Sequence, residues 1–123
     1  MFILDTSAII EIINGTQNGK RIINETIGEM IFTTCFSVYE INLGAKQKEI
    51  PFIEDLFENL EVLNFDYIQA KESATIYKKL SIKGMIVNEI DIFIASICLL
   101  NNMTLVTTDK DFLRIPNLKI KHF

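Results

Sequence analysis

The chain opens with Phe2-Ile3-Leu4-Asp5-Thr6-Ser7, a short apolar run followed at once by acidic and hydroxyl side chains. Isoleucines then recur at helical spacing, at positions 9, 10 and 13, so this stretch predicts a buried strand, a turn and a helix. Near the other end, the chain has the same form in Leu105-Val106-Thr107-Thr108-Asp109. The sequence therefore predicts two strands that each end in an acid.

Strand-like and helical patterns alternate along the rest of the chain. The strand-like patterns cover residues 31–36, 61–65, 103–106 and 118–123. The helical patterns cover a stretch that ends before Gly28, then 37–47, 51–60, a long helix capped by Asp66 that ends before Gly84, 89–100, and a short turn at 111–115. This alternation predicts the α/β class, with a mainly parallel sheet covered by helices.

The composition indicates one domain. With 123 residues, 49% of them hydrophobic, the chain can bury one core but is too short for two ordinary domains. No apolar run approaches the roughly 20 residues of a membrane span, and no leader precedes the first strand, so we expect a soluble, cytoplasmic protein. Cys35 and Cys98 lie far apart and outside any C-x-x-C pattern, which fits small buried side chains in a reducing compartment.

Four acids are predicted to meet at one edge of the sheet, where ligands of open α/β sheets bind. Asp5 and Asp109 follow strands, and Glu40 and Asp91 lie in the first turns of helices entered from the same side. Carboxylate oxygens suit Mg²⁺ or Mn²⁺, and one histidine and two cysteines leave little material for a zinc site. The net charge of −4 by itself disfavours electrostatic binding of nucleic acid over a broad surface. A bound cation would supply positive potential at the place where a phosphate must bind.

Each acid also has a simpler structural interpretation. Glu40 completes a capping box that would begin at Ser37, and Asn88 followed by Asp91 offers a similar but weaker capping explanation for Asp91. Asp5 could be an N-cap and Asp109 an ordinary turn residue. One shared site explains all four acids together, and a carboxylate among the apolar neighbours of Asp91 would be costly to bury without a partner such as a metal ion.

Other polar side chains near these acids are candidates for supporting roles. Asp111 either caps the short helix around it, the interpretation we prefer, or extends the acidic cluster from an outer position. Ser7 and Thr107 are the hydroxyls best placed to orient carboxylates or touch the substrate, ahead of Thr6. His122 is the only histidine and lies next to the last residue, so a nucleophilic triad has little support.

The fragments that carry these residues resemble those of PIN domains and, within that family, of the VapC toxins of prokaryotic toxin–antitoxin pairs. In chain order they are Ile3-Leu4-Asp5-Thr6-Ser7, Ser37-Val38-Tyr39-Glu40-Ile41, Asp91-Ile92-Phe93-Ile94-Ala95, and Leu105-Val106-Thr107-Thr108-Asp109 with Asp111-Phe112. The resemblance covers essentially the whole chain, and its strength lies in the order and spacing of the fragments.

This resemblance implies a PIN-like three-layer sandwich, with residues 1–123 forming a single nuclease domain. It also implies a Mg²⁺ or Mn²⁺ site at Asp5, Glu40, Asp91 and Asp109, with Asp5 as the central ligand. The implied activity is a metal-dependent endoribonuclease that hydrolyses RNA phosphodiester bonds. The implied assembly is a homodimer inhibited by a cognate antitoxin.

Two functions of other classes compete with this hypothesis. A PIN-like fold without catalysis would serve as an interaction module. A dimer or antitoxin contact could use exposed apolar side chains among Ile50, Phe52, Ile53, Leu56 and Phe57, although the pattern of this helix favours core packing. A phosphoacceptor signalling domain shares the size, acidic balance and α/β layout. That class needs adjacent acids after the first strand, whereas Asp5 is followed by Thr6 and Ser7.

Overall fold

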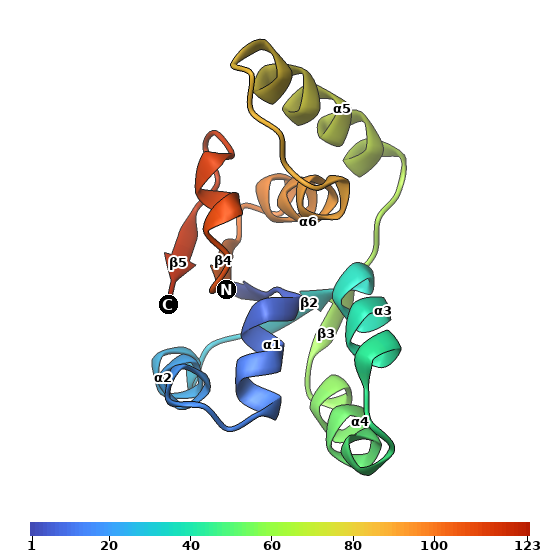
Figure 1. The fold of residues 1–123 in the computed structure, drawn as a ribbon, viewed down its shortest axis with the longest axis vertical. Helices are drawn as coiled ribbons and strands as arrows, with labels where there is room; N and C mark the ends of the chain where they lie inside the picture. Colours follow the sequence, from blue (N-terminus) through green and yellow to red (C-terminus); the bar gives the residue numbers. More distant parts are fainter.

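A sheet of five strands crosses the protein, and helices cover both of its faces (Figure 1). The computed structural model describes residues 1–123. In chain order the elements are β1 (Phe2–Leu4), α1 (Thr6–Ile13), α2 (Gln17–Thr26), β2 (Ile31–Thr34), α3 (Cys35–Gly44), the 3₁₀ helix η1 (Gln47–Glu49), α4 (Ile50–Glu58), β3 (Glu61–Leu63), α5 (Tyr67–Ile82), α6 (Glu89–Leu100), β4 (Thr104–Thr107), the 3₁₀ helix η2 (Lys110–Arg114) and β5 (Ile120–His122).

All neighbouring strands are parallel, in the order β3-β2-β1-β4-β5. The chain first moves outward from β1 through β2 to β3, then crosses over to β4 on the other side of β1 and ends at β5. The order therefore reverses between β1 and β4, and this reversal opens a crevice beyond the carboxyl ends of those two strands. The prediction of an α/β fold with a mainly parallel sheet is confirmed.

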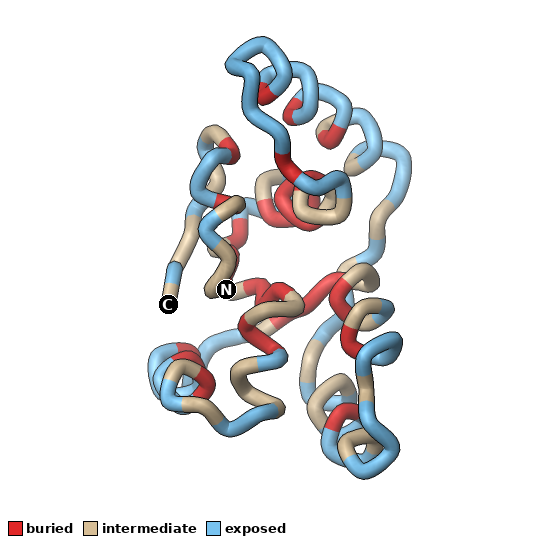
Figure 2. Tube along the Cα trace, in the orientation of Figure 1, coloured by how far each residue is buried: buried red, intermediate tan, exposed pale blue.

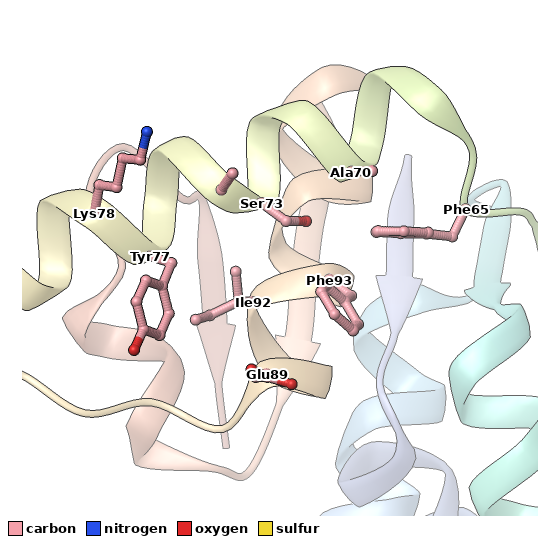
Figure 3. Close-up of a pocket in the computed structure, with 9 residues that line it drawn as sticks. Phe65, Ala70, Ser73, Tyr77, Lys78, Glu89, Ile92 and Phe93 are labelled. Carbon is pink, nitrogen blue, oxygen red and sulfur yellow. The ribbon is translucent and has the colours of Figure 1, made fainter.

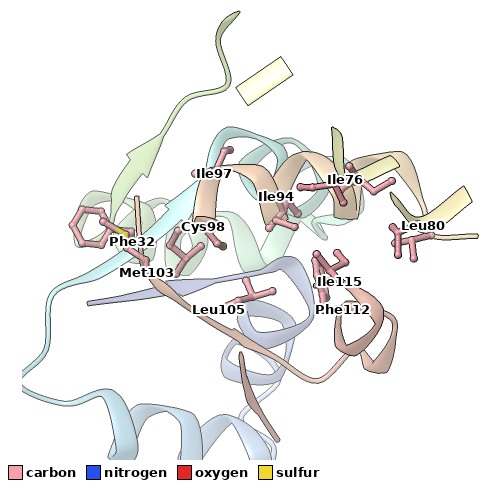
Figure 4. Packing of buried hydrophobic residues seen from close by; sticks show 14 residues of the cluster. Phe32, Ile76, Leu80, Ile94, Ile97, Cys98, Met103, Leu105, Phe112 and Ile115 are labelled. Carbon is pink, nitrogen blue, oxygen red and sulfur yellow. The ribbon is translucent and has the colours of Figure 1, made fainter. Parts of the chain in front are cut away.

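The two faces of the sheet bury separate hydrophobic clusters because successive side chains of a strand point to opposite faces. Ile3 and Leu105 are register partners in one cluster, which includes buried side chains of α5, α6 and η2 (Figure 4). Leu4 and Val106 are register partners in the other, which includes buried side chains of α1, α2, α3 and α4. The helices thus form one layer on each face, and the buried positions concentrate along the strands and the inner sides of the helices (Figure 2). This arrangement is the expected three-layer sandwich.

The start of α3 differs from the prediction. A strand was expected over residues 31–36 and a helix from Ser37, but β2 ends at Thr34 and α3 begins at Cys35. The Thr34 hydroxyl is the N-cap and accepts a hydrogen bond from the Ser37 amide at 3.2 Å. Threonine favours strands and also caps helices, so the sequence pattern alone could not fix the boundary.

The boundaries of the other helices and strands differ from the prediction by a few residues. The helix predicted over 37–47 ends at Gly44, and residues 47–49 form a separate 3₁₀ turn. Asp66 caps α5 as predicted, accepting a hydrogen bond from the Tyr67 amide at 2.8 Å.

Cys98 is fully buried, whereas Cys35 is only half-buried. None of the helices has the length and apolar character that a bilayer crossing requires.

Candidate active site

The four predicted acids line one cleft beyond the carboxyl ends of β1 and β4. The cleft has a volume of about 190 Å³, and its walls are Asp5, Thr6, Ser7, Ile10, Glu40, Asp91, Ile94 and Asp109. Asp5 directly follows β1, Asp109 lies two residues after β4, and Asp91 lies in the first turn of α6. Glu40 lies in the second turn of α3 rather than the first, because the helix begins two residues earlier than predicted.

Asp5 is held rigidly, with only 3% of its surface exposed. Its Oδ1 accepts hydrogen bonds from the Ser7 hydroxyl at 2.7 Å and from the Ala8 amide at 2.9 Å. Its Oδ2 accepts one from the fully buried Thr107 hydroxyl at 2.5 Å. Asp5 is therefore the N-cap of α1 and a wall of the cleft at the same time, so its two interpretations do not exclude each other.

Ser7 and Thr107 also join the two loops that form the crevice. The Ser7 hydroxyl accepts a hydrogen bond from the Thr108 amide at 3.0 Å, and the Thr107 hydroxyl accepts one from the Asp109 amide at 2.9 Å. The two hydroxyl oxygens lie 3.1 Å apart. These contacts fix the end of β1 relative to the end of β4, which is the supporting role expected of buried polar networks.

The capping role suggested for Glu40 is wrong, whereas Asn88 caps α6 as the sequence suggested, without a capping box completed by Asp91. Thr34 caps α3, and Ser37 lies fully buried inside that helix, so no capping box forms between Ser37 and Glu40. The Oε1 atom of Glu40 instead accepts a hydrogen bond from the Thr6 hydroxyl at 2.7 Å. The cap of α6 is the Asn88 side chain, which accepts from the amide of residue 90 at 2.8 Å.

Asp111 belongs to the acidic cluster and is not a helix cap, so the preferred interpretation of this residue is wrong. Asp109 caps η2 by accepting a hydrogen bond from the Asp111 amide at 2.9 Å. Carboxylate oxygens of Asp91, Asp109 and Asp111 lie within 4.8 Å of one another, close enough to hold one cation. Asp111 also pairs with Arg114 at 3.8 Å on the outer side of the group.

The electrostatics of the cleft disfavour charged carboxylates. Burial is the main cause of a raised pKa at Asp5, and the charge of Asp109 adds to it, while hydrogen bonds from Thr107, Ala8 and Ser7 act in the opposite direction. Burial and then the negative charges of the neighbouring acids, Asp109 foremost, raise the pKa of Asp91 to about 7. A cation or a shared proton is the physical remedy for such crowding.

The largest cavity of the protein lies elsewhere, between α5 and α6, and has a volume of about 360 Å³. Figure 3 shows Phe65, Tyr77, Ile92 and Phe93 around it, with Glu89 as its one acid. The sequence analysis did not identify this cavity. Apolar side chains that line a groove have the same helical spacing as side chains that fill a core, so the pattern cannot separate the two. The four predicted acids meet instead at the crevice between β1 and β4.

The fold places this protein among three-layer α/β sandwiches with a parallel sheet, and its cleft gathers four carboxylates at the reversal of strand order. Within that class, the chain belongs to the PIN domain family, whose family model matches residues 2–118.

Two curated relatives are similar to this chain in sequence. Ribonuclease VapC3 of Methanocaldococcus jannaschii is 36% identical over 95 residues, which cover 77% of this chain and 95% of the relative. Ribonuclease VapC2 of Rickettsia felis is 28% identical over 131 residues, which cover 100% of this chain and 98% of the relative.

Two solved structures with a similar fold each contain a VapBC assembly. The crystal structure of VapBC2 from Rickettsia felis bound to a DNA fragment from its promoter superposes with a TM-score of 0.83 at 27% identity, covering 99% of this chain and 98% of the other. DNA-bound VapBC from Salmonella typhimurium gives a TM-score of 0.84 at 26% identity, covering 98% and 96%.

Proposed function

We propose that the protein is a divalent-metal-dependent endoribonuclease that acts as the toxin of a type II toxin–antitoxin pair. The observation that carries the proposal is the convergence of Asp5, Glu40, Asp91 and Asp109 on one cleft at the reversal of strand order. Two relatives named as ribonucleases support the activity, and VapBC assemblies among the similar structures support an antitoxin as partner. RNA is the proposed substrate and a homodimer the proposed assembly.

The residues of the cleft fit a hard cation. Every candidate ligand is a carboxylate or hydroxyl oxygen, the donor type that Mg²⁺ and Mn²⁺ prefer. Burial first, and then the negative charge of neighbouring acids, raises the pKa of Asp5 and of Asp91, and a bound cation would favour the charged form of both. Asp5, Glu40, Asp91 and Asp109 would hold the ion, with Asp111 at the outer side. When bound, such an ion lowers the pKa of a water ligand and offsets the charge of a phosphodiester.

The chain itself contributes position and shape. Ser7 and Thr107 hold Asp5 in one orientation, so this carboxylate needs no rearrangement when the substrate arrives. Ile10 and Ile94 give the cleft its two apolar wall residues and limit access of bulk water from those sides. Lys110 and Arg114 flank Asp111 in η2, where cationic side chains can contact a polynucleotide backbone.

The test is cleavage of a mixed RNA pool by the purified protein, with cut ends mapped by sequencing. Specific cuts are expected with Mn²⁺, and no cuts with EDTA or with the Asp5→Asn variant. The matched control is Asp55→Asn, which removes an exposed acid on α4 and should cleave like the unmodified protein. Metal-dependent cleavage retained by Asp5→Asn would refute the assignment.

The competing functions have different outcomes. An interaction module would bind its partner and leave RNA intact under every condition. A phosphoacceptor domain would form a stable acyl phosphate with a small phosphodonor. The structure disfavours that chemistry at Asp5, because its carboxylate is buried and both of its oxygens already accept hydrogen bonds.

A further inference from the structure

Thr6 makes the hydrogen bond that orients Glu40, the one acid of the cleft carried by α3. We propose that Thr6 is a positioning residue that fixes the Glu40 carboxylate toward the cation site, an inference that rests on the proposed metal-dependent function. Thr6 directly follows Asp5, so the first turn of α1 supplies an acid and, one residue later, the hydroxyl that holds a second acid.

The direction of this hydrogen bond follows from counting protons. Thr6 Oγ1 lies 2.7 Å from Glu40 Oε1 and 3.2 Å from Ser37 Oγ. Both oxygens are positioned as acceptors from the Thr6 hydroxyl, which carries one proton, and that proton goes mainly to the closer and negatively charged Glu40 oxygen. The Thr34 hydroxyl donates to Ser37 Oγ at 3.4 Å, so a chain of three neighbouring hydroxyls runs from Thr34 through Ser37 to Thr6.

This chain is anchored in the core. Ser37 and Thr34 are fully buried, and the Thr34 hydroxyl is fixed as the N-cap of α3 by the Ser37 amide. The buried Ser37 and Thr34 side chains cannot move freely and therefore fix the position of the Thr6 hydroxyl.

Glu40 needs this support more than the aspartates do. A glutamate side chain is longer than that of aspartate and loses more rotational freedom when it is ordered. Asp5 is held by three donors, and Asp109 by the Asp111 amide. The hydrogen bond from Thr6 uses Oε1 of Glu40, so Oε2 remains available for a cation in the cleft. Glu40 would therefore contribute one oxygen in a fixed direction.

The test measures Mn²⁺ binding without RNA, from the loss of the electron paramagnetic resonance signal of free Mn²⁺. Thr6→Val keeps the shape of the side chain and removes the hydroxyl, and we expect its Mn²⁺ affinity to fall about tenfold, as with other partners of ligating side chains. Thr6→Ser should restore most of the affinity. The matched control is Thr26→Val, which removes a buried hydroxyl bonded within α2, away from the cleft, and should bind Mn²⁺ normally.

A double-mutant cycle separates a positioning role from an independent one. If Thr6 acts through Glu40, adding Thr6→Val to Glu40→Gln should weaken Mn²⁺ binding no further. Losses that multiply in the double variant, or unchanged affinity in Thr6→Val, would overturn the inference. Thermal unfolding without metal checks that each variant is folded. If Mn²⁺ binding depends on Thr6 but the protein cleaves no RNA, the nuclease proposal alone is refuted. If the protein cleaves RNA but Thr6→Val binds Mn²⁺ with unchanged affinity, this inference alone is refuted.

Discussion

Replacing Asp91 by asparagine should stabilise the metal-free protein at neutral and alkaline pH, although it removes a residue of the proposed site. The ordinary pKa of this aspartate is 3.8, and in the folded protein burial and the neighbouring acids raise it to about 7. The folded state therefore holds the Asp91 proton more tightly than the unfolded state. Stability is highest when both states are protonated, below about pH 4, and falls as the pH rises toward 7.

The size of the effect follows from the pKa shift. A shift of about three pH units corresponds to about 4 kcal/mol at pH values above both pKa values. Asp91 is only half-buried, so solvent screening reduces the expected contribution to about 2 kcal/mol. Asparagine keeps the shape of the side chain without the charge, and at pH 8 the variant should melt roughly 6 to 10 °C higher than the unmodified protein.

Thermal unfolding in EDTA at pH 4 and at pH 8 measures this difference. The two proteins should melt at similar temperatures at pH 4 and separate at pH 8. Mn²⁺ should stabilise the unmodified protein at pH 8 and have little effect on the variant. The bound ion offsets the negative charge of the Asp91 carboxylate, and the variant lacks that charge. A variant that is less stable than the unmodified protein at pH 8 in EDTA would contradict the electrostatic account of the cleft.

Three further substitutions test the structure in other places. Gly19→Ala should destabilise the protein by about 1 to 3 kcal/mol in urea unfolding, because its Cβ would lie 2.2 Å from the Glu11 carbonyl oxygen where α1 and α2 meet. Thr107→Val should lower RNA cleavage by about 10- to 100-fold by freeing Asp5 Oδ2, whereas Thr107→Ser should retain most of it. Leu105→Ala should cost about 2 to 5 kcal/mol of unfolding free energy, because this side chain is fully buried between β4 and α6.

The sequence predicted the fold well because its strongest signals are local. Apolar runs that end in acids mark the carboxyl ends of β1 and β4, and the alternation of strands and helices leads to a parallel sheet. The start of α3 was misplaced because Thr34 can end a strand and cap a helix. The family resemblance, drawn from the same fragments, implied the same architecture, and the match of the PIN domain model to residues 2–118 agrees with it.

The sequence was less informative about which groups touch one another inside the site. Glu40 had a credible capping partner three residues away, but its hydrogen-bond partner is Thr6, which lies 34 residues earlier in the chain. Asp111 had an equally credible cap role, yet Asp109 caps the same turn and leaves Asp111 facing the acids. Capping patterns are local and can be found by spacing, whereas contacts between α1 and α3 depend on how the layers pack.

The geometry divides the acids by what each can still offer to a cation. A carboxylate has about four lone-pair positions, and Asp5 uses three of them for Ser7, Ala8 and Thr107, so it can give one more contact through Oδ2. Asp91 and Asp109 belong both to the cleft and to the group of three acids whose oxygens lie within 4.8 Å of one another. Asp5 is therefore held in place with one lone-pair position left for a cation. Asp91 and Asp109 lie between the cleft acids Asp5 and Glu40 and the outer acid Asp111. Burial is the first cause of the raised pKa of Asp91, about 7, and the negative charges of Asp109, Asp5, Glu40 and Asp111 add to it, so a cation bound beside Asp91 would offset the second of these causes.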